Sequence, residues 1–231
     1  MFCKGGPTFF ELVHQSLCST HRGYDLLAPK FDLTPFRTPD EMLEPAIAVI
    51  GSAEAALDIC CGTGAAMRLL RPICRQKLVG IDFSSGMLQQ AKQKLGAAPG
   101  TASVELLEAD VLQMNFEKEF DVVTCFGALG HIPSKEKSAF LQRIHRALGP
   151  GGRFVFYSAH RPPLLSFRGL ALRTFNATMK VRNALLKPPF VMYYMNFSMP
   201  EIVEALKRTG FAVDIHARLY REYHLMIATR V

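Results

Sequence analysis

The feature that most constrains the fold of this chain is a short apolar run that ends in two glycines. Residues 55–59 read as a buried strand with one carboxylate, Asp58, and the chain turns at Gly62 and Gly64 before a helical pattern begins at Ala65. Glycine adopts backbone angles closed to other residues and lets a ligand approach the main chain, while the following helix presents free N–H groups. Strand, tight turn and helix together predict a cofactor-binding turn.

Two classes of cofactor use such a turn, and the spacing separates them. A dinucleotide-binding turn has a third small residue, for close packing of helix on strand, at the place where this chain has Met67. S-adenosylmethionine carries a cationic amino group and a sulfonium, so an acid such as Asp58 beside the turn suits it chemically. We therefore expect S-adenosylmethionine as the cofactor, with a nucleotide-dependent reductase as a distant alternative.

At this turn the sequence resembles the class I S-adenosylmethionine-dependent methyltransferases, whose first motif reads D/E-x-G-x-G-x-G. Asp58, Gly62 and Gly64 match that motif, whereas Cys60 stands where the first glycine is usual. The variant Cys-Cys-Gly-Thr-Gly is familiar in quinone-type and related small-molecule methyltransferases. The simplest interpretation of Cys60 and Cys61 themselves is as small residues that fill the end of a strand.

Strand patterns alternate with helical patterns after the turn. The further strands are expected at 77–82, 104–111, 120–126 and 153–157, and closing strands follow at 211–217 and 223–229. Such alternation predicts an α/β, doubly wound, mostly parallel sheet with a ligand crevice at the carboxyl ends of the strands. The resemblance implies seven strands in all, with an antiparallel last strand.

Acidic residues recur at the carboxyl ends of these strands. Asp58, Asp82 and Asp110 all fall on the same predicted edge, and Phe126 joins them there. Asp82 lies 18 residues beyond Gly64, near the spacing at which a second-strand carboxylate takes the ribose hydroxyls of an adenosine cofactor. The alternative interpretation is that these carboxylates cap loops.

The resemblance implies cofactor-binding roles for the glycine turn and the first two acids. Asp58 would face the methionine ammonium, and Gly62 and Gly64 would make room for the methionine portion. Asp82 would accept both ribose hydroxyls, because a carboxylate has two oxygens for two donors.

Five further residues complete the predicted cofactor site. Asp110 and the N–H of Val111 would bind the adenine amino group and a ring nitrogen. Phe126 and Met87 would pack on the adenine and sulfonium flanks, with ordinary core packing as the alternative. Tyr24 belongs to a tyrosine-aspartate element that, in the family, folds over the cofactor.

His131 is the one candidate for a catalytic group. Methyl transfer is a displacement at carbon, which requires alignment and the exclusion of water, and a base is needed only if the acceptor loses a proton. His131 follows the fourth strand and could reach the acceptor. Its alternative roles are to shape the pocket wall or to cap the following helix.

We expect a single methyltransferase domain with an insertion. An N-terminal helical cap (1–50) precedes the cofactor-binding core (51–159), and a closing helix and strand hairpin (198–231) follow a lid-like insertion (160–197). The insertion is predicted to hold an amphipathic helix at 170–186 and to cover a small, hydrophobic or aromatic acceptor. Its apolar lining would come from Leu164, Leu165, Phe167, Phe190, Val191, Met192, Tyr193, Tyr194 and Met195.

Two sequence signals predict helix starts. Thr38-Pro39-Asp40-Glu41 and Ser198-Met199-Pro200-Glu201 both read as capping boxes, with an N-cap hydroxyl followed three residues later by glutamate.

Composition limits the remaining classes of function. Six cysteines without a CxxC pair indicate neither a metal site nor a disulfide framework and suit a reducing cytosol. No run reaches the roughly 18 apolar residues of a spanning helix, so we expect a cytoplasmic protein for which peripheral membrane contact stays open.

Charge leaves two alternatives open. From Lys137 to Pro200 the chain has ten Lys or Arg and no Asp or Glu, which keeps an RNA or protein methyltransferase as an alternative. Lys187-Pro188-Pro189-Phe190 resembles the N/D/S-P-P-Y/F motif of enzymes that methylate amino groups of nucleic-acid bases. In those enzymes the motif belongs at the end of the fourth strand and does not begin with lysine, so methylation of nucleic-acid bases is disfavoured. A noncatalytic cofactor-binding partner subunit is the other alternative, and the oligomeric state is not predicted.

Overall fold

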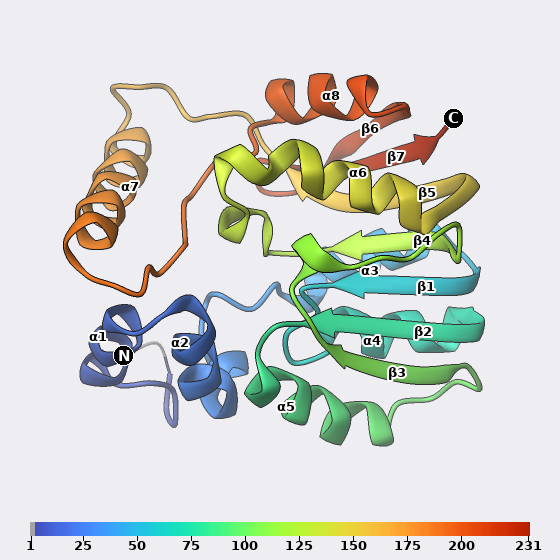
Figure 1. Ribbon diagram of the computed structural model, residues 1–231, viewed down its shortest axis with the longest axis horizontal. Coiled ribbons are helices and arrows are strands. Elements are labelled where there is room, and N and C mark those ends of the chain that lie inside the picture. The colour runs from blue at the N-terminus through green and yellow to red at the C-terminus, as the bar shows by residue number, and fades with distance from the viewer. Residues whose placement is uncertain (1–2) are drawn as a thin grey trace.

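A seven-stranded sheet forms the centre of the protein (Figure 1). The structure, a computed structural model, describes residues 3–231, apart from the side chains of residues 217–219. The spatial order is β3-β2-β1-β4-β5-β7-β6. The strands are β1 (Ala53–Ile59), β2 (Cys74–Asp82), β3 (Ser103–Glu108), β4 (Phe120–Cys125), β5 (Leu148–Ser158), β6 (Phe211–Tyr220) and β7 (Tyr223–Arg230).

The predicted fold class is confirmed. The first five strands pair in parallel, whereas β7 runs antiparallel to both β5 and β6. The helices are α1 (Phe9–Leu17), α2 (Thr20–Leu27), α3 (Asp40–Ile50), α4 (Ala65–Leu70), α5 (Ser85–Gly96), α6 (Lys137–Ala147), α7 (Phe167–Leu185) and α8 (Met199–Arg208).

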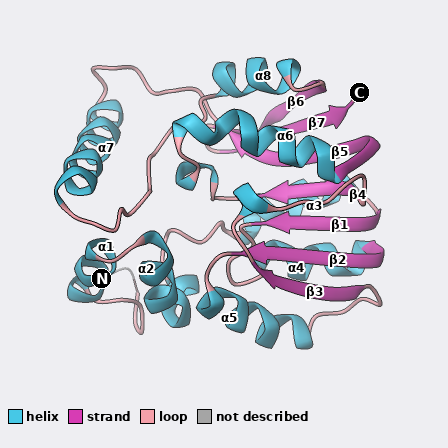
Figure 2. Cartoon of the chain, viewed as in Figure 1, coloured by secondary structure: helices cyan, strands magenta, loops and turns pink. Residues whose placement is uncertain are grey.

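Helices cover both faces of the sheet (Figure 2). Successive residues of a strand point to opposite faces and therefore meet different helices. Leu57 and Ile59 of β1 belong to a buried cluster that includes residues of α6 and α8, whereas Ala56 belongs to a second cluster with α3, α4 and α5. Because both faces are covered, β1 reads as the continuous apolar run seen in the sequence.

The carboxyl ends of β1, β2 and β4 meet at one edge of the sheet, where α1, α2 and α7 gather (Figure 1). The predicted helix at 170–186 is present as α7, a few residues longer at its start. In the region expected to form an N-terminal helical cap, the described residues contain α1 and α2 before α3. No helix in the described range 3–231 is long and apolar enough to cross a membrane.

Both predicted capping boxes were wrong in their side-chain contacts. The N-cap of α3 is Pro39, one residue later than expected, and no side chain caps this helix. The Thr38 hydroxyl lies instead against the β4–α6 connection, where a Cβ on Gly127 would come within 2.8 Å of it. Ser198 is the N-cap of α8, as predicted, but it makes no capping hydrogen bond.

The start of β5 also differs from the prediction. The glycine-rich residues 149–152, expected to separate helix and strand, form the first part of β5. Leu148 pairs with Phe120 of β4, and an irregularity in the pairing follows before Arg153 pairs with Val122. A strand irregularity of this kind absorbs a glycine-rich stretch without ending the ladder.

Candidate active site

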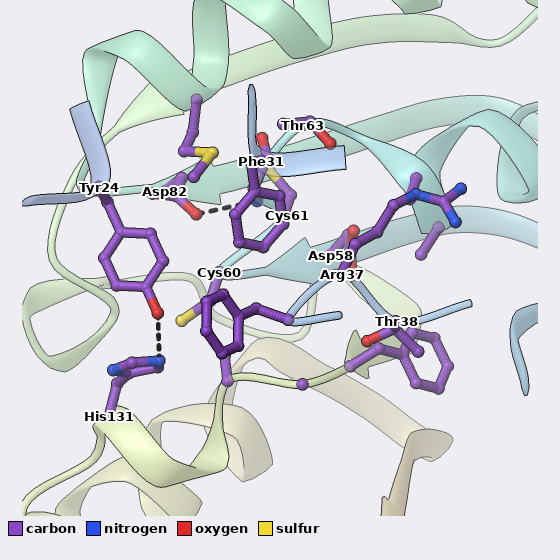
Figure 3. Close-up of a pocket in the computed structure, with 18 of the residues that line it drawn as sticks. Tyr24, Phe31, Arg37, Thr38, Asp58, Cys60, Cys61, Thr63, Asp82 and His131 are labelled. Atoms are coloured by element: carbon purple, nitrogen blue, oxygen red, sulfur yellow. Dashed lines mark hydrogen bonds between the residues drawn. The ribbon is translucent and has the colours of Figure 1, made fainter. Parts of the chain in front are cut away.

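An inner cavity of about 100 Å³ lies at the sheet edge where β1, β2 and β4 end (Figure 3). Most of the residues predicted to bind a cofactor line it, together with the predicted catalytic histidine. These are Tyr24, Asp58, Gly62, Asp82, Met87, Phe126 and His131.

Asp58 is a buried carboxylate without a basic partner in the described contacts. It is 2% exposed, and its Oδ1 accepts a hydrogen bond from the Thr124 hydroxyl of β4 at 2.7 Å. Burial raises the pKa of Asp58 to about 7, the Thr124 hydrogen bond opposes that rise, and the nearby Asp82 adds to it. A cationic group bound here would therefore form an ion pair with a carboxylate that is already removed from water, and it would stabilise the ionised form of Asp58.

Asp82 organises the glycine turn. Its Oδ2 accepts from the Gly62 N–H and its Oδ1 from the Ser84 N–H, each at 2.9 Å. Burial raises the pKa of Asp82, while these two hydrogen bonds lower it. Each carboxylate oxygen still has a free lone pair, so the group can accept two further donors. A Cβ on Gly62 would meet no atom within 4 Å, so the main chain is open to a ligand there.

Cys60 takes the backbone conformation that explains why glycine is usual at its position. Its φ is +55°, in the left-handed region that favours glycine. Hydrogen bonding to the Cys125 thiol, together with burial, raises the pKa of Cys60, so the thiol is a poor nucleophile. The interpretation of Cys60 as a small residue at a strand end is thus incomplete, because its backbone angle makes it a substitute for glycine.

Three predicted cofactor residues lie outside the inner cavity. Gly64 packs α4 against α5, where a Cβ would come within 3.1 Å of the Ala91 side chain. Asp110 is exposed, and its carboxylate accepts from the Leu112 N–H at 2.9 Å, while Val111 is buried in the core. Their roles toward a cofactor stay predictions.

The tyrosine-aspartate element lies on α2. Asp25 accepts hydrogen bonds from the Ser84 hydroxyl at 2.6 Å and from the Gly86 N–H at 3.0 Å, so it holds α2 against the start of α5. This contact places the adjacent Tyr24 side chain at the cavity wall, beside Phe83.

His131 contacts Tyr24 across the cavity. Its Nε2 lies 2.8 Å from the Tyr24 hydroxyl (Figure 3). Its Nδ1 lies 2.6 Å from the Val191 carbonyl oxygen. A carbonyl only accepts, so Nδ1 carries the proton and Nε2 accepts from the tyrosine. Burial lowers the pKa of His131 and raises the pKa of Tyr24, which keeps both groups neutral at pH 7.

An outer cavity of about 670 Å³ adjoins the inner one. Both cavities share Tyr24 and His131 in their walls, as well as the loop residues Phe36 to Thr38. The chain contains six tyrosines, and every one of them lines this outer cavity: Tyr24, Tyr157, Tyr193, Tyr194, Tyr220 and Tyr223. Of the apolar residues predicted to line an acceptor pocket, Met192 to Met195 do so, and Leu164 lines a neighbouring groove, whereas Leu165 and Phe167 are exposed.

Several lining residues were missed in the sequence. The segment before α3 contributes Phe31, Phe36, Arg37 and Thr38, of which only Thr38 belonged to a predicted motif, and that motif was a helix cap and not a binding site. Arg37 is held by Asp40, whose Oδ1 accepts from its guanidinium at 2.6 Å. Phe83 could have been found, because it directly follows Asp82 at the end of β2.

Comparisons with known proteins agree with this geometry. Residues 56–152 match the family model of a methyltransferase domain. A 2-phytyl-1,4-naphtoquinone methyltransferase of Nostoc punctiforme is 34% identical over 178 residues, which cover 71% of this chain and 75% of the relative. A demethylmenaquinone methyltransferase of Geobacillus kaustophilus is 30% identical over 181 residues, covering 74% and 76%.

A solved structure shares the fold. The magnesium protoporphyrin IX methyltransferase of Synechocystis PCC 6803, crystallised with bound S-adenosylhomocysteine, aligns with a TM-score of 0.58 at 19% identity. The alignment covers 83% of this chain and 82% of that protein.

Proposed function

The chain belongs to the class I S-adenosylmethionine-dependent methyltransferases, and from this membership we propose that it methylates a small aromatic acceptor of the quinone type. The observation that carries the proposal is the gathering of all six tyrosines around the outer cavity. Aromatic rings stack on one another and on flat ligands, and their hydroxyls hydrogen-bond to oxygen substituents. The names of the relatives, which include naphthoquinone substrates, support the same class of acceptor.

The inner cavity suits the methionine end of the cofactor. Asp58 would hold the ammonium, because its buried carboxylate lacks a positive partner, and the open main chain at Gly62 would accommodate the methionine chain. Asp82 would accept the ribose hydroxyls. The adenosine would extend along the sheet edge toward Asp110 and Val111, with Met87 and Phe126 of the cavity wall at its flanks.

The Tyr24–His131 pair would serve in proton transfer. Bound S-adenosylmethionine supplies an electrophilic methyl group on sulfur, and a hydroxylated aromatic acceptor becomes a stronger nucleophile when it loses a proton. The pair lies in the wall between the two cavities, so the proton would pass to His131 Nε2 directly or through the Tyr24 hydroxyl. The Val191 carbonyl would hold the resulting imidazolium at Nδ1.

The segment 160–197 would act as the cover of the acceptor site within a single domain. Its residues from Met192 to Phe197 line the outer cavity, and Arg168 of α7 does so too, paired with Glu222 of the β6–β7 turn. The predicted N-terminal cap would contribute to the same site through Tyr24 and the loop before α3, which also line the outer cavity. We further propose that the protein is cytoplasmic and makes peripheral contact with a membrane, where acceptors with lipid tails reside.

An acceptor screen tests the proposal. The purified protein is incubated with S-adenosylmethionine and a panel of short-tailed hydroquinones, catechols, aliphatic amines, a peptide and RNA, and S-adenosylhomocysteine is measured. Turnover confined to the hydroquinones, with a methyl group located on the product by NMR, is the expected result. Turnover of RNA or peptide instead, or of amines alone, would refute the quinone-type acceptor.

A further inference from the structure

Helix α1 turns its apolar side to solvent. Phe9, Phe10, Val13 and Leu17 recur at helical spacing on one side of the helix, and all four are exposed, Phe10 by 80%. The opposite side carries Gln15, the residue of α1 that is buried against the rest of the protein. This orientation is the reverse of that expected for a helix on a water-facing surface.

Helix α7 shows the same inverted orientation. Gly169 and Met179 form its buried side. Phe167, Leu170, Val181 and Leu185 fall within one sector of the opposite side at 100° per residue, with Phe167 90% and Leu185 77% exposed. The turn before the helix adds Leu165, which is 100% exposed.

The two helices belong to one surface. Arg182 of α7 donates hydrogen bonds to the carbonyl oxygens of Ser16, at 2.9 Å, and Cys18, at 2.8 Å, at the end of α1. Figure 1 shows both helices beyond the same edge of the sheet, at the end where the strands carry the site. Exposed apolar stripes on two neighbouring helices exceed the scattered exposure that is normal for a soluble protein.

The charged residues of the segment that contains α7 are all of one sign. Residues 160–197 contain six Lys or Arg and no Asp or Glu. Arg173 and Lys180 border the apolar side of α7, and neither forms an ion pair within the described part of the chain. Cations beside an exposed apolar stripe are the arrangement by which helices lie in the interface of an anionic bilayer.

A basic groove connects this surface with the acceptor site. The groove has a volume of about 530 Å³, and Lys137, Arg161, Arg173 and Lys180 are among its lining residues. It shares residues Tyr193 to Asn196 with the outer cavity, so the two spaces adjoin. A molecule that leaves a bilayer beneath α7 would reach the tyrosine-lined cavity along this groove.

We propose that α1 and residues 161–187 form a docking surface for an anionic lipid bilayer, oriented so that an acceptor with a lipid tail passes through the basic groove into the outer cavity. The passage of the acceptor rests on the proposed function, whereas the docking does not. The phosphates of RNA would also bind the Lys and Arg side chains of this surface. They would not interact favourably with the exposed apolar side chains of the two helices. The stripes therefore favour a bilayer.

Vesicle flotation tests the docking without any turnover. Wild-type protein should float with phosphatidylcholine vesicles that contain phosphatidylglycerol, and binding should fall about tenfold or more without the anionic lipid. The double variant L165D/F167D should lose binding by a similar factor, because two apolar side chains no longer enter the interface. Val231, 87% exposed at the opposite end of the sheet, supplies the matched control V231D, which should bind as the wild type does.

Each other outcome overturns the proposal. Equal flotation of L165D/F167D and the wild type would remove the surface from any role in membrane binding. Alternatively, the wild type fails to float with vesicles and is instead dimeric by light scattering, with L165D/F167D monomeric. That result would assign the surface to contact with a second copy of the chain. Binding to RNA that persists in L165D/F167D and vanishes in R173Q/K180Q, without flotation, would assign it to nucleic acid.

A second readout separates this proposal from the proposed function. A soluble, tail-less hydroquinone should be methylated equally by the wild type and L165D/F167D, whereas a long-tailed hydroquinone in anionic vesicles should be methylated about tenfold more slowly by the variant. Flotation without any hydroquinone turnover would leave the docking surface standing and refute the acceptor class alone.

Discussion

Asp58 combines a cost in folding with a gain in binding. Burial raises the pKa of its carboxyl to about 7, because the ionised form has left water and has one neutral donor, Thr124, in place of a counterion. At neutral pH and above, the ligand-free protein therefore carries a charge that opposes its folding. The ammonium of the cofactor is the partner that relieves this cost.

The first prediction concerns Asp58→Asn. The amide keeps the shape and still accepts from Thr124, but it cannot pair with an ammonium, so calorimetry should show at least about tenfold weaker binding of S-adenosylhomocysteine. Urea unfolding at pH 8 should show a larger free energy of unfolding, by at most about 4 kcal/mol, since a rise of about three pKa units corresponds to that amount.

A matched control lies at the other end of β1. Asp121 accepts hydrogen bonds from the N–H groups of Glu54 and Ala55, so Asp121→Asn should lower stability and leave cofactor affinity unchanged. Wild-type affinity in a folded Asp58→Asn variant would show that the ammonium binds elsewhere.

The second prediction concerns His131. His131→Asn keeps a donor for the Val191 carbonyl but has no basic nitrogen toward Tyr24, so kcat should fall about 100-fold while cofactor affinity changes less than threefold. For the wild type, kcat should decline only at pH values below the ordinary range of histidine, because burial lowers the pKa of His131. An unchanged kcat in His131→Asn would reduce the histidine to a wall residue.

Residues were predictable where a strand end marked them. Asp58 and Asp82 each close an apolar run, and the parallel sheet brings those ends together, so the sequence pattern placed both at the cavity. Arg37 and Thr38 come from an irregular loop just before Asp40, and the position of this part of the chain depends on long-range contacts, such as the 3.0 Å hydrogen bond from Arg68 to Asp40. Local sequence carries no signal for such contacts.

Helices and strands were predicted best where the hydrophobic pattern of the sequence matches the side of the element that is buried. The strands of the central sheet read as apolar runs because helices cover both faces, and β7 was expected to be antiparallel only by resemblance. The outward apolar stripes of α1 and α7 could not be foreseen, since the period identifies an amphipathic helix but not which side it buries. Phe167 of α7, expected to line the acceptor pocket, is exposed for that reason.

The third prediction belongs to the segment around α7. Replacing residues 164–186 with a short Gly/Ser bridge should leave cofactor affinity within a few fold, because the inner cavity draws none of its described lining from this segment. Turnover of the acceptor should be abolished, since Arg168 and the support of Met192 to Met195 would be lost.

Circular dichroism and the melting temperature with and without cofactor would serve as the controls for folding. A folded deletion variant that no longer binds the cofactor would place the segment against the adenosine. Full turnover would make it dispensable.

At the scale of the whole molecule, one end of the sheet carries every proposed contact with a ligand. The inner cavity is lined by residues at the carboxyl ends of β1, β2 and β4, and it shares wall residues with the outer cavity, which in turn shares wall residues with the basic groove. Helices α1 and α7 lie beyond the same ends of these strands (Figure 1). The opposite end is closed by local polar contacts, such as those of Asp121 with β1. The parallel topology causes this division, because it sends all the loops that follow the strands to one side.

The last prediction joins protonation, cofactor binding and the stability of the whole fold. Burial raises the pKa of Asp58, to about 7, and of Asp82 above its ordinary value, so in the ligand-free protein each folded carboxyl holds its proton more tightly than the unfolded one. An acid with a raised folded-state pKa contributes stability below its unfolded pKa of about 4, and this contribution is lost as pH rises through the folded value. From Asp58 alone, the ligand-free protein should therefore lose stability between about pH 4 and pH 7.

The wild type and Asp58→Asn are compared by urea unfolding at pH 5 and pH 8. The difference between them isolates the contribution of Asp58 to the free energy of unfolding from that of other carboxylates, such as Glu222, whose pKa is lowered by Arg168. The advantage of the variant should be small at pH 5 and largest at pH 8. Saturating S-adenosylhomocysteine should reverse the order at pH 8, because its ammonium stabilises the ionised Asp58 and shifts the folding equilibrium by mass action. An advantage of Asp58→Asn that does not change with pH would mean that this carboxyl keeps an ordinary pKa, and the electrostatic account of the cofactor site would then fail.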